Sequence, residues 1–344
     1  MTQLEQYYEL RKKKFFTITL LLTILLTVTL LLSLSVGSVN IGIDKAFLVL
    51  TGYVQNKTLS YIVLNIRLPR TLASILIGAS LAISGVLIQN VTRNALAEPF
   101  LLGLSSGALA FIALAILLIP SIIFSIHYVS IVAFIGAILA FTLTLMLSEA
   151  VGGSATSLIL AGIAVTSGFS GISSFLAFIV QAKLNRPFLI LLLGSLAQIL
   201  DEHVIVLGFT FTLGFIVSLA LAKRLNAVMF GDEHSLQLGY SPKITRLISS
   251  LLAALLTSVS VAVAGIIGFI GLVIPHMARL LMGNDNRFVI PLSALLGSIL
   301  LCLSDIFVRI ASGGLAIGEI PVGAVTSAFG APFFAYLLMA KVRS

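Results

Sequence analysis

The residues best suited to chemistry in this sequence are four charged side chains that lie within or beside long apolar stretches. Arg67 and Arg70 flank a Leu-Pro dipeptide, and Asp305 precedes Arg309 by four positions. Ionisable groups in such stretches are costly, so each needs a reason. The first two could snorkel to a membrane interface or present positive charge to an acidic partner. Asp305 and Arg309 would share one helix face and could pair. The predicted chemistry is therefore recognition of carboxylates, within the chain or on a partner.

Other kinds of site are not indicated. The histidines form no HxxxH or HExxH pattern, so zinc chemistry has no support, and the single cysteine, Cys302, lies in an apolar run as a packing residue. No GxxxxGK[ST] motif is present, so any ATP must be hydrolysed by another chain. The apolar stretches hold no paired carboxylates for a proton relay and no acid–base pair or nucleophile set. We expect no catalytic residue, no metal ligand and no cofactor bound by this chain.

The elements that must position these side chains are membrane helices. Of 344 residues, 59% are hydrophobic and only 9% charged, against about a quarter in soluble domains. The net charge of +8 is spread between apolar runs rather than gathered on one basic face, which argues against nucleic-acid binding. A helix needs about 20 apolar residues to cross a bilayer. We predict an all-α polytopic membrane protein with about ten transmembrane helices, at 15–36, 67–90, 99–120, 128–148, 157–180, 203–222, 246–267, 268–283, 289–311 and 321–340.

The cations orient this arrangement. With the N-terminus inside and ten spans, 13 of the 20 Lys and Arg residues fall on the cytoplasmic side and 7 on the other, as the positive-inside rule requires. A single transmembrane domain, 15–340, is then flanked by a cytoplasmic N-terminus, 1–14, and a cytoplasmic C-terminus, 341–344. On the other side, 189–199 is an apolar piece too short to cross, which favours a short surface or re-entrant helix.

The longest cytoplasmic loop inside this domain is 223–245. Gly231 and Gly239 allow tight turns around a short helix at about 233–238, and Ser241-Pro242 is typical of the start of the next helix. The loop also carries apolar residues that no membrane core requires. Such a set favours a knob seated in a cleft of another protein.

The fifth predicted span is unusually polar. Thr166, Ser170, Ser173 and Ser174 would lie on one face of a helix. A polar-lined pathway and ordinary hydrogen-bonded packing both fit this pattern, so both stay open.

Several motifs in a fixed order resemble a known family, the permease subunits of ABC importers for iron-siderophores, haem and cobalamin (FecCD-like). The resemblance runs from about residue 60 to 340. It rests on RLPR at 67–70, GASLAISGVLIQN at 78–90, NALAEPFLLGLSSGA at 94–108, LAGIAVTSGFSG at 160–171, LLGSL at 192–196, GIIGFIGLVIPHMARLLMGNDNR at 265–287, PLSALLG at 291–297 and EIPVGAVTSAFGAPFFAYLL at 319–338. Asn286 stands where the family usually has His, which weakens the case for a role of that position.

The resemblance implies a ten-helix, type II ABC importer permease architecture. It implies a second permease subunit, which is expected to be another copy of this chain in a homodimer. It also implies two ATPase subunits that use ATP and Mg, and an extracytoplasmic substrate-binding protein that delivers a metal chelate. The binding protein would dock on Arg67, Arg70 and Arg309. The ATPase would contact the loop 223–245 through Leu225, Phe230, Gly231, Asp232, Glu233, Leu238 and Gly239. The path between subunits would include Thr166, Ser170, Ser173 and Ser174.

A different class of function stays open beside this one. A stand-alone secondary carrier driven by an ion gradient would have the same composition and a similar number of spans. The cargo also stays open, because iron-siderophore, haem and cobalamin are not distinguished by the residues named here. The chain is expected in the cell membrane, in contact with lipid.

Overall fold

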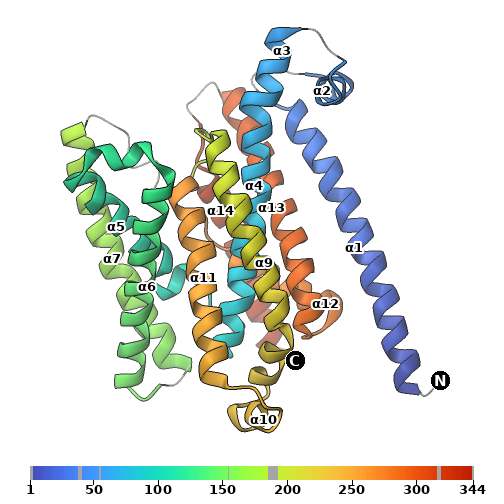
Figure 1. The fold of residues 1–344 in the computed structure, drawn as a ribbon, viewed down its shortest axis with the longest axis vertical. Helices are drawn as coiled ribbons and strands as arrows, with labels where there is room; N and C mark the ends of the chain where they lie inside the picture. The colour runs from blue at the N-terminus through green and yellow to red at the C-terminus, as the bar shows by residue number, and fades with distance from the viewer. Residues whose placement is uncertain are drawn as a thin grey trace.

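The computed structural model describes residues 3–37, 41–53, 56–153, 155–184, 193–315 and 319–342, and within these ranges the regular structure is entirely helical. Figure 1 shows α4, α9, α11, α13 and α14 at the centre, with α5, α6 and α7 grouped on one side and α1 on the other. Seven of the described helices are long and apolar enough to cross a membrane, and two further apolar helices are shorter. The chain is therefore a multi-pass membrane protein.

Each of the ten predicted stretches contains a helix. In chain order these are α1 (Gln3–Ser35), α4 (Leu68–Val91), α5 (Leu104–Leu118), α6 (Ile126–Ala150), α7 (Ala155–Leu184), α9 (Asp201–Met229), α11 (Pro242–Ala264), α12 (Ile270–Met282), α13 (Asn286–Leu315) and α14 (Val322–Val342). Shorter elements are α2 (Ile43–Leu50), α3 (Lys57–Tyr61), the π-helical η1 (Ile62–Arg67), the 3₁₀ turns η2 (Phe100–Leu102) and η3 (Pro120–Phe124), and α10 (Asp232–Gln237).

The second predicted stretch begins too late. The helix starts at Lys57, where the Asn56 side chain accepts hydrogen bonds from the Thr58 and Leu59 N–H groups, and it continues through η1 into α4. The polar residues at 55–58 hide the start of the helix in the sequence. Arg67 is consequently inside a continuous helix rather than at its first turn.

Other boundaries also differ from the sequence predictions. The sixth predicted span ends at 222, but α9 continues to Met229, so residues 223–229 of the predicted loop 223–245 are helical. The first helix extends from Gln3 instead of residue 15, because the charged residues before the apolar run continue the same helix. In the predicted short helix 189–199, residues 189–192 lie outside the described residues, and residues 194–200 contain turns and no helix. Gly194 has a left-handed φ of 72° there.

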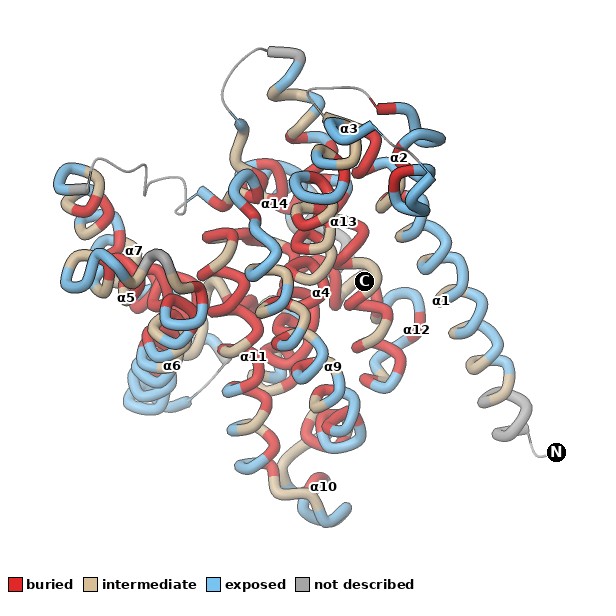
Figure 2. The backbone as a smooth tube through the Cα atoms, turned by 45° about the horizontal axis from the view of Figure 1, so that its top comes forward, coloured by how far each residue is buried: buried red, intermediate tan, exposed pale blue. Residues whose placement is uncertain are grey.

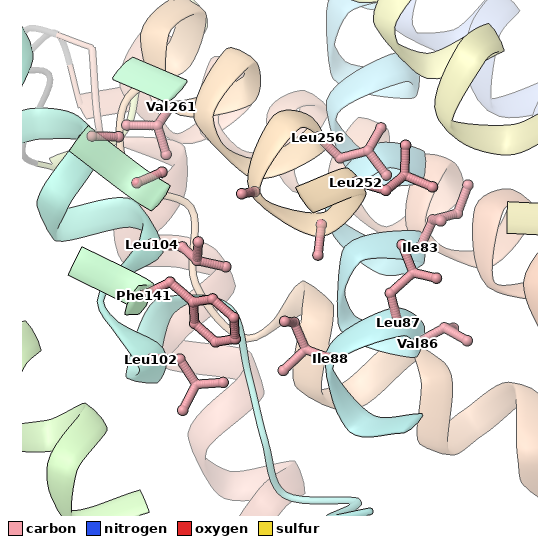
Figure 3. Packing of buried hydrophobic residues seen from close by; sticks show 14 of the residues in the cluster. Ile83, Val86, Leu87, Ile88, Leu102, Leu104, Phe141, Leu252, Leu256 and Val261 are labelled. Atoms are coloured by element: carbon pink, nitrogen blue, oxygen red, sulfur yellow. The ribbon is translucent and has the colours of Figure 1, made fainter. Parts of the chain in front are cut away.

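The burial pattern separates structural helices from lipid-facing ones. In the most apolar part of α4, 83% of residues are buried, against 6% in α1, and Figure 2 shows this contrast along the two helices. The largest core cluster joins α4, α5, α6 and α11, and its labelled members in Figure 3 include Ile83, Leu87, Leu104, Phe141 and Leu256. Helix α4 is thus packed on several sides and forms the centre of the bundle.

Close backbone contacts explain several glycines on α4. A Cβ on Gly78 would lie 2.2 Å from the Gly297 carbonyl oxygen of α13, and a Cβ on Gly85 would lie 2.0 Å from the Gly271 carbonyl oxygen of α12. Small residues allow helices to approach this closely in lipid. The contact of α4 with α13 therefore depends on the absence of side chains at 78 and 297.

Replacing Gly78 with Ala is expected to lower the free energy of unfolding by about 1–3 kcal/mol, because a methyl group there must push two backbones apart. Gly168→Ala on α7 is the matched control, since its Cβ meets nothing within 4 Å and alanine is the better helix former. Unfolding in mixed detergent micelles measures both. Equal stability of the two variants would contradict the packing account.

Candidate functional site

Two of the predicted docking arginines close the end of α1. Arg67 donates through Nη1 to the carbonyl oxygens of Leu34 (2.8 Å) and Ser35 (2.9 Å). Arg309 donates through Nη1 to the carbonyl oxygens of Ser33 (2.8 Å) and Val36 (3.1 Å). The last carbonyls of a helix lack partners inside the helix and carry its negative dipole end. Two guanidinium groups, from the end of η1 and from α13, satisfy them here and fasten α1 to the bundle.

The third arginine belongs to a buried ionic cluster. Arg70 binds Asp305 with Nε (2.9 Å to Oδ1) and Nη2 (2.6 Å to Oδ1), and Arg309 Nη2 lies 3.0 Å from Asp305 Oδ2. Arg70 Nη2 also pairs with Glu319. The Asp305 side chain has no exposed surface. We call Arg70, Asp305, Arg309 and Glu319 the arginine–carboxylate cluster.

The three arginines that were predicted to dock a partner protein are largely buried. The side chains of Arg70 and Arg309 are 12% and 8% exposed, and Arg67 is 5% exposed overall. The pairing of Asp305 with Arg309 is confirmed. The three cations have structural partners within the chain. Snorkelling of Arg67 and Arg70 to the interface and docking on the three arginines both stay predictions.

At the opposite end of the bundle, α10 lies in the connection between α9 and α11, which is residues 230–241 of the predicted loop (Figure 1). Phe230 is 79% exposed, Leu236 61% and Leu238 54%. Gly231 and Gly239 have φ of 127° and 79°, values that residues with a Cβ rarely adopt. The short helix α10 lies between them, and the Ser241 side chain accepts from the Ile244 N–H at the start of α11. The predicted turn–helix–turn is therefore present.

Two members of the predicted ATPase contact have other partners. Leu225 is 1% exposed and belongs to the core cluster, so it is unavailable to a partner; the sequence pattern did not distinguish the buried face of α9 from the exposed loop. Asp232 turns toward its own chain, where it pairs with Arg93 and accepts from Arg246 Nη2 (2.7 Å) and Nη1 (3.1 Å). Glu233 is exposed. Asp232 thus fixes α10 against the α4–α5 connection and α11.

Above α10, three asparagines join three helices. Asn286 donates to Asn90 Oδ1 (2.9 Å) and Asn226 Oδ1 (2.8 Å), and Asn226 donates to Asp285 Oδ1 (2.8 Å). Partial burial alone would raise the pKa of Asp285, but hydrogen bonds from Arg287 and Asn226 hold it below its usual value. Asn286 is fully buried. The presence of Asn in place of His weakened the case for a role of this position, yet the Asn286 amide links α4, α9 and α13 through its hydrogen bonds.

The four polar residues of α7 do not share one environment. Thr166 is buried and donates to the Phe100 carbonyl (3.2 Å), and Ser173 is 2% exposed and donates to the Ser170 carbonyl (3.0 Å). Ser170 is half-buried, and Ser174 is exposed. Hydrogen-bonded packing explains Thr166 and Ser173. The predicted path-lining role of these four residues stays a prediction.

A buried carboxyl group lies where the α4–α5 connection meets α12. Glu98 Oε1 accepts a 2.6 Å hydrogen bond from the N–H of Phe269, the residue before α12, which has a left-handed φ of 68°. Burial raises the pKa of Glu98 to about 7, although the Phe269 N–H acts in the opposite direction. The carboxyl thus holds an unusual backbone turn in place at the cost of a destabilised charge.

Stability should consequently depend on pH through Glu98. The folded pKa lies above the unfolded one, so the unfolded state loses its proton first and stability falls as pH rises from about 4.5 to about 7. In Glu98→Gln that loss is absent, and the amide oxygen can still accept from Phe269. Between pH 5 and 7.5 the variant should gain about 2 kcal/mol relative to the native chain. Parallel unfolding midpoints of the two proteins across this range would contradict the assignment.

Several of these residues have no clear signal in the sequence. Arg93, Arg246 and Glu319 act through ion pairs whose partners lie 139, 14 and 249 positions away, respectively. Ser33, which accepts at the end of α1, is one serine among many. Arg93 and Glu319 can be recognised as members of ion pairs only when the positions of the segments that carry their partners are known.

Comparisons with known proteins agree with this architecture. The model of the FecCD transport family matches residues 25–340. A "Probable iron chelatin transport system permease protein" of Helicobacter pylori is 37% identical over 82% of this chain and 83% of its own. The "Hemin transport system permease protein HmuU" of Yersinia pestis is 37% identical over 90% of this chain and 92% of its own.

A solved structure is similar along nearly the whole fold. It is described as a metal-chelate type ABC transporter in an inward-facing conformation, and it superposes with a TM-score of 0.79 at 29% identity, covering 94% of this chain and 99% of the other. The overall fold is thus shared with that structure. The family match, the relatives and the fold lead to one conclusion: this chain belongs to the FecCD transport family.

Proposed function

We propose that the chain is the transmembrane permease subunit of an ATP-driven importer that carries an iron(III)-siderophore, or another iron chelate such as haem, delivered by a substrate-binding protein. ATP would be hydrolysed by separate subunits, since this sequence has no nucleotide-binding motif. The chain itself would do no covalent chemistry. It would move a whole chelate by changing which end of a cavity is open.

The proposal rests on the exposed apolar side chains of the connection between α9 and α11, residues 230–241, which we call the α10 loop. Phe230, Leu236 and Leu238 are exposed in and beside the short helix α10, which is flanked by two glycine turns and bound to the bundle by the ion pairs of Asp232. A solvated loop needs neither the apolar side chains nor the fixed frame. A second protein that moves on ATP binding needs both, because motion enters a bundle only through a rigid contact. The asparagine network directly above would pass that motion to α4, α9 and α13.

The remaining parts of the proposal follow the relatives. Both termini would be cytoplasmic, on the same side as α10, and the arginine–carboxylate cluster would face the substrate-binding protein outside. A second copy of the chain would complete the path, with Ser174 on its wall. The relatives are named for iron chelatin and hemin transport, which supports a chelated iron cargo over a bare ion.

Purification from native membranes tests the proposal. A mild detergent extract of the tagged chain should retain an ATPase, and the complex should hydrolyse ATP faster when its binding protein and chelate are added. A chain that purifies without an ATPase and still transports in vesicles would favour an ion-driven carrier instead.

A further inference from the structure

Arg70 has two carboxylate partners of unequal accessibility. Asp305 holds it from the buried side through three hydrogen bonds of 2.6 to 3.1 Å. Glu319, in the connection that precedes α14, pairs with Nη2 of the same guanidinium. The Glu319 side chain is 28% exposed, whereas that of Asp305 is 0% exposed. One partner is therefore locked in the core, and the other lies at the surface.

Only the surface partner can be exchanged at low cost. Removing Asp305 from Arg70 would leave buried charges without partners and would open the contact in which Gly78 and Gly297 touch. Glu319 can rotate into water, where its charge is well solvated. Arg67 and Arg309 also bond to carbonyl groups that end α1, which fixes them further. Among the described contacts of the predicted docking arginines, the contact of Arg70 with Glu319 is one with a partly exposed carboxylate.

We propose that Glu319 occupies, on Arg70, the place of a carboxylate of an acidic docking partner, and that docking displaces it. The inference rests on the proposed function, with the substrate-binding protein as the partner. An Arg guanidinium pairs with a carboxylate in a defined geometry. The Glu319 carboxylate and a carboxylate of the docking partner would therefore compete for the same side of Arg70. Glu319 thereby sets the docking affinity and keeps Arg70 oriented before the partner arrives.

Displacement of Glu319 would reach α14. The next residue, Ile320, donates to the Ser312 hydroxyl (3.0 Å), and Gly323 packs so tightly that a Cβ would lie 2.5 Å from the carbonyl oxygens of both Ile266 and Leu193. Further along, a Cβ on Gly330 would lie 2.4 Å from Phe269. Release of the connection at residue 319 therefore loosens the start of a helix that is otherwise closely held by two loops. Docking outside would be sensed by α14 through this single ion pair.

The same helix borders a cavity. A volume of about 210 Å³ lies between α12, α13 and α14, lined by Phe269, Ile270, Val273, Met277, Leu300, Ser304, Thr326, Phe329 and Gly330. Movement of α14 against α12 has room to occur there without a new void being opened.

The test compares Glu319→Gln with Glu202→Gln. Glu202 lies in the first turn of α9 and is exposed, so the control removes the same charge from outside the cluster. The probe is the binding protein that stimulates ATP hydrolysis by the wild-type complex, and the readout is its affinity for the permease complex in lipid nanodiscs. Glu319→Gln should bind it about threefold or more tightly, because the internal competitor is gone. Glu202→Gln should stay within about twofold of wild type.

The outcomes separate this inference from the proposed function. If no binding protein binds or stimulates the wild-type complex, the proposed function fails and the inference falls with it. If wild type binds but Glu319→Gln binds as Glu202→Gln does, or more weakly, the inference alone is overturned. Glu319→Ala, which removes the side chain without adding an amide, should match Glu319→Gln, and equal melting temperatures in detergent confirm that both variants are folded.

Discussion

Replacing Asp305 with Asn should lower the free energy of unfolding by about 3–5 kcal/mol. Asp305 is fully buried and serves Arg70 and Arg309 at once. Without its charge, two guanidinium groups from α4 and α13 face each other with Glu319 as the one remaining carboxylate of the cluster. Unfolding in mixed detergent micelles, followed by circular dichroism, gives the measurement.

A double-mutant cycle isolates the ionic part of this loss. Asp305→Leu should be severely destabilising, whereas Asp305→Leu combined with Arg309→Leu should recover part of the loss, because the unpaired charge leaves with its partner. Asp201→Asn, at the exposed first turn of α9, is the matched control and should cost less than about 1 kcal/mol. If Asp305→Asn unfolds at the same denaturant concentration as the control, the cluster does not hold the bundle together.

Truncation of Phe230 to Ala should abolish most coupled transport and leave the fold unchanged. The side chain is 79% exposed, so its loss changes stability by no more than about 0.5 kcal/mol. Aromatic anchors seated in a partner's cleft contribute at least about 2 kcal/mol, which corresponds to roughly 30-fold in affinity. ATPase retention during purification and ATP-driven uptake should fall together by about tenfold or more.

Tyr53→Ala is the matched control for Phe230. Tyr53 is 80% exposed and follows α2, which lies at the opposite end of the bundle from α10 (Figure 1). The control should keep its ATPase. Gly231→Val should resemble Phe230→Ala, since a φ of 127° is strained for a β-branched residue. Normal transport by the Phe230 and Gly231 variants would remove the coupling role from the α10 loop.

The sequence predicted the helices well because lipid imposes a simple requirement. An apolar run of about 20 residues has few alternatives to a helix in a bilayer, so each of the ten stretches contains one. The errors lie where that requirement is absent. The cationic residues before Phe15 and the polar residues near Lys57 sit outside the hydrocarbon region, and helix starts there depend on capping, such as the Asn56 side chain, more than on hydropathy.

The candidate sites were predicted in type more than in detail. Motifs located Arg67, Arg70 and Arg309 but could not reveal that the carbonyl groups ending α1 bind two of them, because every residue has a carbonyl. Periodicity placed Thr166 and Ser173 with Ser174, yet only the neighbouring helices decide which of these faces is covered. Asp232 was assigned to a partner protein because Arg93 and Arg246 are distant or unremarkable in sequence.

Uptake by reconstituted vesicles tests the central claim most directly. Vesicles that contain this chain with its ATPase, given the binding protein loaded with a ⁵⁵Fe-siderophore outside and ATP inside, should accumulate the chelate. Accumulation should stop when a non-hydrolysable nucleotide replaces ATP, and it should not respond to an imposed proton gradient. Uptake that follows a proton gradient in vesicles containing this chain without any ATPase would contradict the account.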